Sequence, residues 1–196
     1  MAYYAPGAEY IFTGSILTAD GRNLTQQRNR EVLETKLKSL PLDKALKIGG
    51  GSHTVIEVTD PDCPFCRKAA TFFTQRSDVT RYIFFYPLAS IHPNAEAKIR
   101  QIFCVEDPAK AYEEAMSGKM DDMKFTPCKS EEADRLVKAH KELGDRLGMA
   151  GVGTPLFLVD GKVVNGANIP EMERILAIQE KAPQPVTGET PAAGAR

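Results

Sequence analysis

The stretch that decides the expected fold is VTDPDCPFCRK, at residues 58–68. It follows directly on an apolar run, Thr54–Thr59, which predicts a strand, and it leads into Pro64–Gln75, which predicts a helix with proline in its first turn. Cys63 and Cys66 therefore fall where a strand passes into a helix. Two cysteines at this spacing and in this place indicate a dithiol that exchanges disulfides.

The expected position of Cys63 favours its thiolate. Free N–H groups and the dipole at a helix N-terminus stabilise negative charge, and Arg67 and Lys68 are expected to add positive potential. Both effects lower a thiol pKa, and the thiolate is the nucleophile. Cys66, one turn into the helix, can attack a mixed disulfide formed at Cys63. The alternative is a structural disulfide or a buried thiol pair.

Glu57 interrupts the apolar strand six residues before Cys63. A carboxylate in a central strand is costly unless it is protonated or paired. We hypothesise a buried acid with a raised pKa that lies beneath the dithiol and takes the Cys66 proton. The alternative is an exposed residue on an edge strand.

The segment GVGTP, residues 151–155, precedes a second apolar strand. A proline at the first position of a strand can follow a cis bond. A cis Pro155 beside the dithiol would present the backbone of Thr154 to an extended substrate. The residues alone do not decide between cis and trans.

Cys104 and Cys128 are the other two cysteines, at the end of an expected helix and in a loop. A disulfide between them would close a loop of about 25 residues and would persist only in an oxidising compartment. Two independent buried thiols are the alternative. A zinc site with Cys63 and Cys66 is disfavoured, because zinc ribbons present two close cysteine pairs and 23 residues separate Cys104 from Cys128. No metal is expected.

The remaining sequence predicts an α/β domain with appendages. A β-prone segment covers Glu9–Leu17, and a helix over Thr25–Leu40, capped by Thr25, either links domains or packs on one. Gly49-Gly50-Gly51-Ser52 indicates a flexible joint. The other expected elements are a strand over Val79–Leu88, helices over Asn94–Val105, Pro108–Met116, Glu131–Leu147 and Glu171–Lys181, and a hairpin of Pro155–Val159 with Lys162–Asn165. A strand–helix–strand unit followed by a hairpin predicts a mixed central sheet with helices on both faces.

Composition narrows the class of protein. The chain has 196 residues, a net charge of −1, 42% apolar and 26% charged residues, which is typical of a soluble globular protein and gives no sign of a nucleic-acid partner. Its apolar runs are too short to span a bilayer. Residues 1–7 lack the basic and apolar regions of a signal peptide, so the protein is cytosolic or the sequence is a mature or shortened form.

The motif at residues 58–68 resembles the active-site region of the bacterial periplasmic disulfide isomerases DsbC and DsbG. The resemblance continues at Ile102–Val105 and Pro127-Cys128, which look like that family's second, structural cysteine pair, and at Val152–Pro155, which looks like its Thr before a cis-Pro. It extends through Asp160-Gly161-Lys162 to the last helix and covers residues 47–181. The motifs occur in the family's order, which makes the resemblance specific.

The resemblance implies a thioredoxin fold with a helical insertion at about 93–148, preceded by a linker helix and a short N-terminal strand. On this basis residues 1–24 are a shortened dimerisation region, 25–46 a linker helix and hinge, 47–181 the catalytic domain and 182–196 a disordered tail. The implied site residues are catalytic Cys63, Cys66 and, from the residues themselves, Glu57; substrate-binding Thr154, Pro155, Pro64 and Phe65; and a structural Cys104–Cys128 disulfide. Glu57 departs from the isomerases and is more typical of thioredoxin and of the DsbA oxidases.

The resemblance also implies a function and a compartment. It implies a periplasmic disulfide isomerase or reductase that acts as a homodimer on misfolded, disulfide-containing secreted proteins. Its redox-active disulfide would need no other cofactor and would be kept reduced by a membrane thiol reductant of the DsbD type. The alternatives are a DsbA-like dithiol oxidase, a non-catalytic chaperone module and a cytosolic thioredoxin-like reductase.

Overall fold

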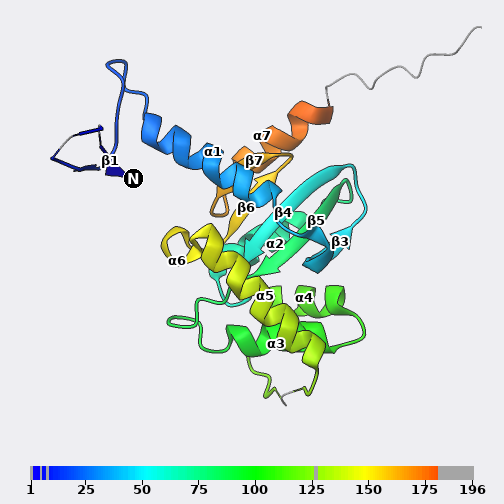
Figure 1. The fold of residues 1–196 in the computed structure, drawn as a ribbon. Coiled ribbons are helices and arrows are strands. Elements are labelled where there is room, and N and C mark those ends of the chain that lie inside the picture. Colours follow the sequence, from blue (N-terminus) through cyan, green and yellow to red (C-terminus); the bar gives the residue numbers. More distant parts are fainter. Residues whose placement is uncertain (1, 5, 8, 126–127, 181–196) are drawn as a thin grey trace, which may run out of the picture.

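A five-stranded sheet forms the centre of the molecule in the computed structural model, which describes residues 2–4, 6–7, 9–125 and 128–180 (Figure 1). The strands are β3 (Leu46–Gly49), β4 (His53–Thr59), β5 (Val79–Phe85), β6 (Leu156–Val159) and β7 (Lys162–Asn165), in the spatial order β3-β5-β4-β6-β7. β4 and β5 are parallel and the other pairs are antiparallel. The mixed sheet expected from the sequence is confirmed.

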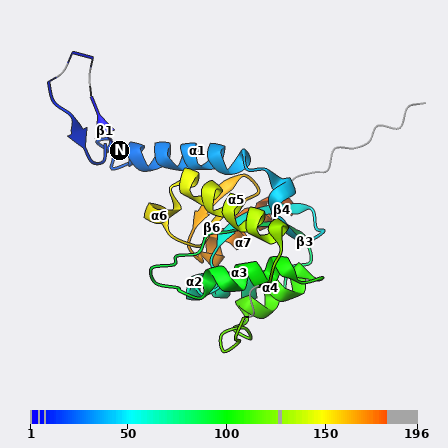
Figure 2. The same cartoon turned by 60° about the horizontal axis from the view of Figure 1, so that its bottom comes forward.

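Helices cover both faces of this sheet, as expected (Figures 1 and 2). Alternation along β4 sends Ile56 and Val58 to one face, where they pack with α1 (Leu24–Lys38), α5 (Glu131–Leu147) and α6 (Met149–Val152). Val55 lies on the other face with α2 (Pro64–Phe73) and α7 (Ile169–Glu180). On that face, α3 (Ala95–Cys104) and α4 (Pro108–Met116) join α2 in a further buried cluster. Because β4 is central, the residues at its C-terminal end are held from both faces.

The expected flexible joint at Gly49–Ser52 is wrong. β3 precedes it in the same sheet, so these glycines connect two strands rather than two domains. They are required by close approach, because a Cβ at Gly51 would lie 1.8 Å from the carbonyl carbon of Asp78, and Gly49 has a φ of +85°. The missed strand β3 is short and only half-buried.

The helix expected over Thr25–Leu40 is α1, but its N-cap is Asn23, whose side chain accepts a hydrogen bond from the Gln26 N–H, and not Thr25. The end of α1 packs on the domain: Leu37 is fully buried and Lys36 Nζ donates to the Arg146 carbonyl at 3.0 Å. The start of α1 leads away to the N-terminal segment, which stands clear of the sheet (Figures 1 and 2). The end of α1 is therefore a packed helix, and a linker role for α1 stays a prediction.

The N-terminal segment, residues 2–23, contains less strand than expected. β2 (Phe12–Thr13) pairs with β1 (Ala2–Tyr3), and Leu17 forms a single bridge with Asn23. We call residues 2–23 the arm. The predicted tail at 182–196 lies outside the described residues, and the division of the chain into functional segments stays a prediction. Within the described part, no helix is long and apolar enough to cross a membrane.

Candidate active site

Cys63 and Cys66 lie where the sequence places them, at the start of α2. Cys63 is the N-cap residue of the helix, Pro64 opens its first turn, and both thiols are free and buried. The Cys63 sulfur lies 3.5 Å from the Thr154 carbonyl oxygen, and the backbone N–H of Asp60 donates to the Cys66 sulfur at 3.4 Å. The two thiols therefore have different surroundings, although two residues separate them.

These surroundings separate the two thiol pKa values. A hydrogen bond from Cys66 lowers the pKa of Cys63 to about 5, helped by the backbone N–H groups of Cys66 and Phe65 and opposed by burial. Burial is the main cause that raises the pKa of Cys66, and the neighbouring Cys63 raises it further. Hydrogen bonds rather than the charges of Arg67 and Lys68 are thus the main source of acidity. At neutral pH the pair holds one thiolate, at Cys63, and one thiol, at Cys66.

The Thr154–Pro155 peptide bond is cis, which is the geometry that the resemblance implied. The carbonyl of Thr154 faces the Cys63 sulfur. The Thr154 hydroxyl is buried and has no hydrogen-bond partner among the described residues. Pro155 is buried, whereas Phe65, two residues after Cys63, is 63% exposed. Their roles in binding a substrate stay predictions.

Cys104 and Cys128 are bonded to each other, with Cα atoms 6.3 Å apart. The bond joins the end of α3 to the segment before α5. These sulfurs are therefore not available as zinc ligands. The chain holds one free pair and one bonded pair, and the bonded pair is the one that the resemblance implied.

The model of a thioredoxin-like domain matches residues 41–181 of this chain. The chain belongs to the thioredoxin-like domain family. It is 28% identical over 167 residues to the probable thiol:disulfide interchange protein DsbC of Bordetella pertussis, covering 84% of this chain and 57% of that protein. It is 27% identical over 188 residues to the Escherichia coli K12 thiol:disulfide interchange protein DsbC, covering 91% and 74% of the two chains.

A solved structure of a disulfide interchange protein is similar to this chain in both fold and sequence. The disulfide interchange protein from Neisseria gonorrhoeae has a TM-score of 0.60 and 31% sequence identity, covering 73% of this chain and 100% of that chain. The chain spans little more than half the length of the Bordetella relatives, 57%. The domain is therefore similar in sequence and fold to proteins named for disulfide interchange.

Glu57 of this thioredoxin-like domain is fully buried, but it is not an unpaired acid. Arg81 Nη2 donates to its carboxylate at 2.6 Å, and the Tyr112 hydroxyl donates to it at 3.0 Å. Arg81 also donates to the Tyr112 oxygen at 2.5 Å. The expected burial of Glu57 is confirmed, but its partners were missed, because Arg81 on β5 and Tyr112 on α4 lie far from it in the sequence. A role for Glu57 in accepting the Cys66 proton stays a prediction.

Asp60 is a site residue that the sequence reasoning missed. Its buried carboxylate accepts hydrogen bonds from the Asp62 N–H at 2.8 Å, the Leu88 N–H at 2.7 Å and His92 Nδ1 at 2.8 Å. Its carbonyl accepts from the Cys63 N–H at 3.1 Å. Asp60 thus fixes the loop that carries Cys63. A polar residue just after a buried strand is the signal that could have found it.

A second missed feature is an ion-pair network beside the dithiol, which we call the charge cluster: Asp62, Arg67, Lys98 and Asp121. It joins the active-site loop, α2, α3 and the segment after α4. These residues are far apart in the sequence, so no local pattern connects them.

Exposed apolar side chains lie on several segments that adjoin the active-site loop of the thioredoxin-like domain. Outside the arm and α1, the described residues include four large apolar side chains that are exposed, and we call them the rim: Phe65, Ile91, Met123 and Val152. Ile91 precedes His92, which contacts Asp60, and Met123 follows Asp121, which pairs with Arg67. Val152 lies two residues before Thr154. All four are thus on segments that contact the active-site loop or α2, or that carry Thr154.

Proposed function

We propose that this chain catalyses thiol–disulfide exchange on secreted proteins, as a disulfide isomerase and reductase. The observation that carries the proposal is the divided dithiol: an acidic Cys63 at a helix N-cap beside the cis Thr154–Pro155 bond, and a buried Cys66 whose thiol pKa is raised. Relatives named for disulfide interchange support the same chemistry.

The reaction begins at the Cys63 thiolate. It attacks one sulfur of a substrate disulfide, a Cys63–substrate bond forms, and the second substrate sulfur leaves as a thiolate that takes a proton from water. In isomerisation another substrate thiolate then attacks the substrate sulfur of this mixed disulfide, which restores the Cys63 thiolate with no net change in oxidation.

Reduction follows a different second step. Cys66 loses its proton and attacks the Cys63 sulfur, which forms the Cys63–Cys66 disulfide and releases a reduced substrate thiolate. The substrate gains two electrons and the protein loses two. We infer that a membrane thiol reductant of the DsbD type returns the two electrons.

Substrate binding is assigned to the surface around the dithiol. An extended chain would pair with the backbone of Thr154 at Pro155, and apolar side chains would contact Pro64, Phe65 and the rest of the rim. Misfolded proteins expose both extended backbone and apolar side chains, so they match this surface.

The periplasm is the compartment that we propose. The Cys104–Cys128 disulfide supports it, because structural disulfides persist in oxidising compartments and are rare in the cytosol.

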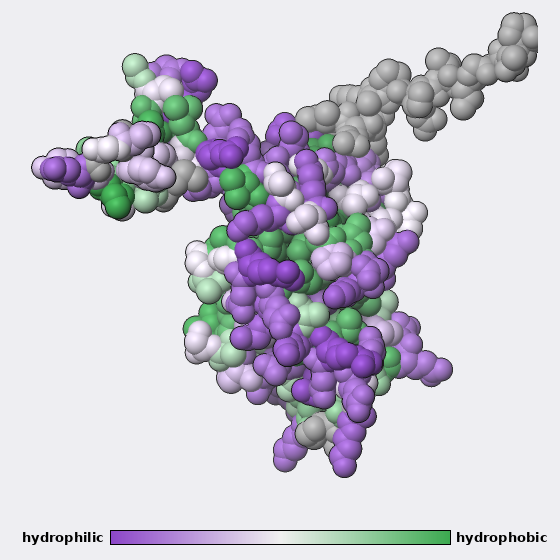
Figure 3. Space-filling model, in the orientation of Figure 1, coloured by the Kyte–Doolittle hydropathy of each residue, from purple (hydrophilic) through white to green (hydrophobic). Residues whose placement is uncertain are grey.

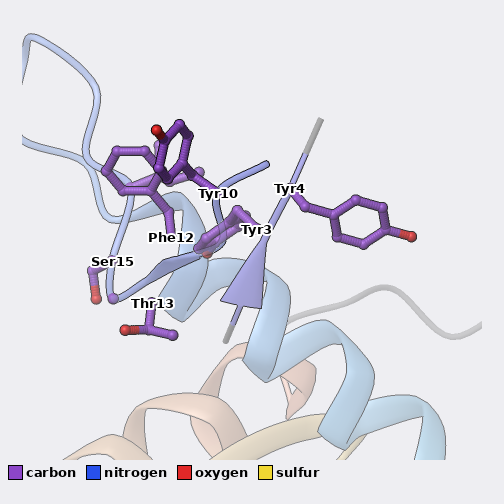
Figure 4. Close-up of a pocket in the computed structure, with 8 residues that line it drawn as sticks. Tyr3, Tyr4, Tyr10, Phe12, Thr13 and Ser15 are labelled. Carbon is purple, nitrogen blue, oxygen red and sulfur yellow. The ribbon is translucent and has the colours of Figure 1, made fainter. Parts of the chain in front are cut away.

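A homodimer formed through the arm is also part of the proposal. The arm exposes large apolar side chains, among them Tyr4 (77%), Tyr10 (75%), Ile11 (71%) and Phe12 (77%). A hollow of about 510 Å³ lies among its residues, with Tyr10 and Phe12 side by side while Tyr4 points away (Figure 4). Apolar surface also marks the protruding arm in Figure 3. A short two-stranded sheet with exposed apolar side chains and open edges is a surface that a second copy of the chain would cover.

A dithiol oxidase is the second candidate. The low pKa of Cys63 favours it, since a stabilised thiolate stabilises the reduced form and makes the couple more oxidising. An oxidase would donate its disulfide to reduced substrates and would reactivate scrambled ones poorly.

Reactivation of a scrambled multi-disulfide protein separates these functions. Wild type, Cys63→Ser and Cys66→Ser are compared in a glutathione buffer, with the solution mass of each measured at micromolar concentration. If the protein is an isomerase, the wild type reactivates the scrambled substrate and the Cys63→Ser variant does not. Equal reactivation by wild type and Cys63→Ser would indicate a chaperone. Rapid oxidation of a reduced substrate, without reactivation of the scrambled one, would indicate an oxidase. A monomeric mass would overturn the dimer.

A further inference from the structure

The charge cluster brings together two cations and two carboxylates from four segments of the fold. Arg67 Nη1 and Nη2 donate to the two carboxylate oxygens of Asp121 at 2.7 and 2.6 Å, and Nη2 also lies 3.2 Å from Asp62 Oδ1. Lys98 Nζ donates to Asp121 at 2.5 Å and also to Asp62. The formal charges of the cluster cancel.

Burial makes this arrangement more than a surface ion pair. The Lys98 side chain is 3% exposed and that of Asp62 is 16% exposed. A cation so buried needs its carboxylate partners, because desolvation otherwise disfavours its charge. The Arg67 side chain, at 26% exposed, is partly shielded as well, whereas that of Asp121 is 42% exposed, so the cluster is buried at Lys98 and open at Asp121. The ion pairs of the buried Lys98 are screened less by salt than pairs between two exposed side chains.

The cluster directly adjoins Cys63. Asp62 is the preceding residue, and Arg67 Nε donates to the Pro61 carbonyl at 2.8 Å in the loop that carries the cysteine. The Arg67 N–H donates to the Cys63 carbonyl at 3.1 Å. The charges of the cluster therefore meet at the loop and the helix turn that hold Cys63.

Two of the four charges come from the insertion. Lys98 is on α3, and Asp121 lies between Cys104 and Cys128, inside the loop that the disulfide closes. The insertion thus supplies one cation and one carboxylate to a network whose other two members are next to the dithiol.

We propose that Asp121 and Lys98 are positioning residues of opposite sign that set the redox equilibrium of the Cys63–Cys66 pair from the insertion. This inference rests on the proposed exchange reaction at the same dithiol. The reduced form carries a thiolate at Cys63 and the disulfide form does not, so a nearby charge changes the energy of the reduced form alone. A positive change favours reduction and a negative change opposes it.

The equilibrium with glutathione measures this effect. The Cys63–Cys66 bond breaks and two glutathione thiols join in one glutathione disulfide, so that two electrons pass to the protein. One proton binds to the Cys66 sulfur, and the other goes to water because Cys63 stays ionised. The chain has no Trp, so the reduced fraction is measured by mass after alkylation of the thiols.

Two neutralising variants give opposite expected results. Asp121→Asn leaves the cluster with a net positive charge and should shift the equilibrium toward the reduced form by about three- to tenfold, where tenfold equals about 30 mV. Lys98→Gln should shift it by a similar factor the other way. The double variant should return close to wild type. Asp122→Asn is the matched control, because it removes the same charge at the neighbouring exposed residue.

A purely structural role predicts a different pattern. Loss of packing would move both single variants in one direction or leave the equilibrium unchanged, and either result would overturn the inference. If Lys98→Gln does not fold, the inference is still overturned when Asp121→Asn and Asp122→Asn have the same redox equilibrium with glutathione. A wild-type protein whose dithiol never equilibrates with glutathione would instead contradict the proposed exchange function.

Discussion

The two cysteine pairs of this chain border one buried cluster, and they differ in how the fold places them. Cys63 caps the N-terminus of α2, where hydrogen-bond donors meet its sulfur, and Cys66 lies buried one turn later. Cys104 is the last residue of α3, at the helix end whose dipole disfavours a thiolate, and it is bonded to Cys128. Position on a helix therefore distinguishes the free pair from the bonded pair.

The largest effect expected is on exchange activity. Cys63→Ser should lower the exchange rate by about a thousandfold or more, because the nucleophile is lost. The Cys104→Ala/Cys128→Ala variant should stay within a few fold of wild type. Turnover of a small disulfide substrate at a temperature where all variants are folded provides the measurement. Equal losses in the two variants would erase the distinction between the pairs.

The ion pair beneath the reactive pair should have the next largest effect, on stability. Arg81→Met leaves the Glu57 carboxylate buried without its cation, which costs about 3–5 kcal/mol in the free energy of unfolding. Urea unfolding measures this loss, and the Glu57→Gln/Arg81→Met variant should recover part of it. A loss below about 1 kcal/mol would contradict the pairing.

Glu57→Gln also tests the predicted proton acceptor. If Glu57 takes the Cys66 proton, this variant should release mixed disulfides more slowly than wild type, whereas attack by Cys63 should be unaffected. Release at the wild-type rate would remove the role, and Glu57 would then be a structural partner of Arg81 alone.

The bonded pair should also contribute to stability, by a different mechanism. Removing the Cys104–Cys128 bond releases a loop of about 25 residues, and the chain-entropy model gives about 3.5 kcal/mol as an upper value. Thermal unfolding of Cys104→Ala/Cys128→Ala against wild type measures it. An unchanged midpoint would show that the insertion is held by packing and the charge cluster without the disulfide.

The sequence was sufficient wherever the signal was local. The dithiol at a strand–helix junction, the hairpin after Pro155 and α4 were all predicted from neighbouring residues, and β4 and β5 form the expected parallel pair. The sequence was insufficient where partners are distant. Arg81 reaches Glu57 across 24 positions, and Asp121 reaches Arg67 across 54, so neither pair leaves a periodic pattern. The glycines at 49–51 were misread because a close backbone approach and a flexible joint have the same composition.

The smallest effect concerns the contact between the insertion and the sheet. His140 accepts from the Phe85 N–H at 3.0 Å and donates to the Lys44 carbonyl at 2.7 Å, and its ring packs against Phe103, next to Cys104. Burial is the main cause that lowers the pKa of His140 to about 4.

Because the folded-state pKa of His140 is lower than its unfolded value of about 6.5, the unfolded chain binds more protons between these pH values. Stability present above about pH 6.5 should fall as pH decreases toward 4, by up to about 3 kcal/mol. Urea unfolding of wild type and His140→Gln from pH 7 to 4 measures the slope. Parallel curves for the two proteins would contradict the buried neutral ring.

The most direct test of the divided dithiol is the pH dependence of Cys63 alkylation in the reduced protein. Iodoacetamide reacts with the thiolate, and mass measurement of peptides identifies the modified sulfur. We expect a midpoint near pH 5 for Cys63 and no reaction at Cys66 at neutral pH. A Cys63 midpoint at the value of a free cysteine, about 8.5, would contradict the account.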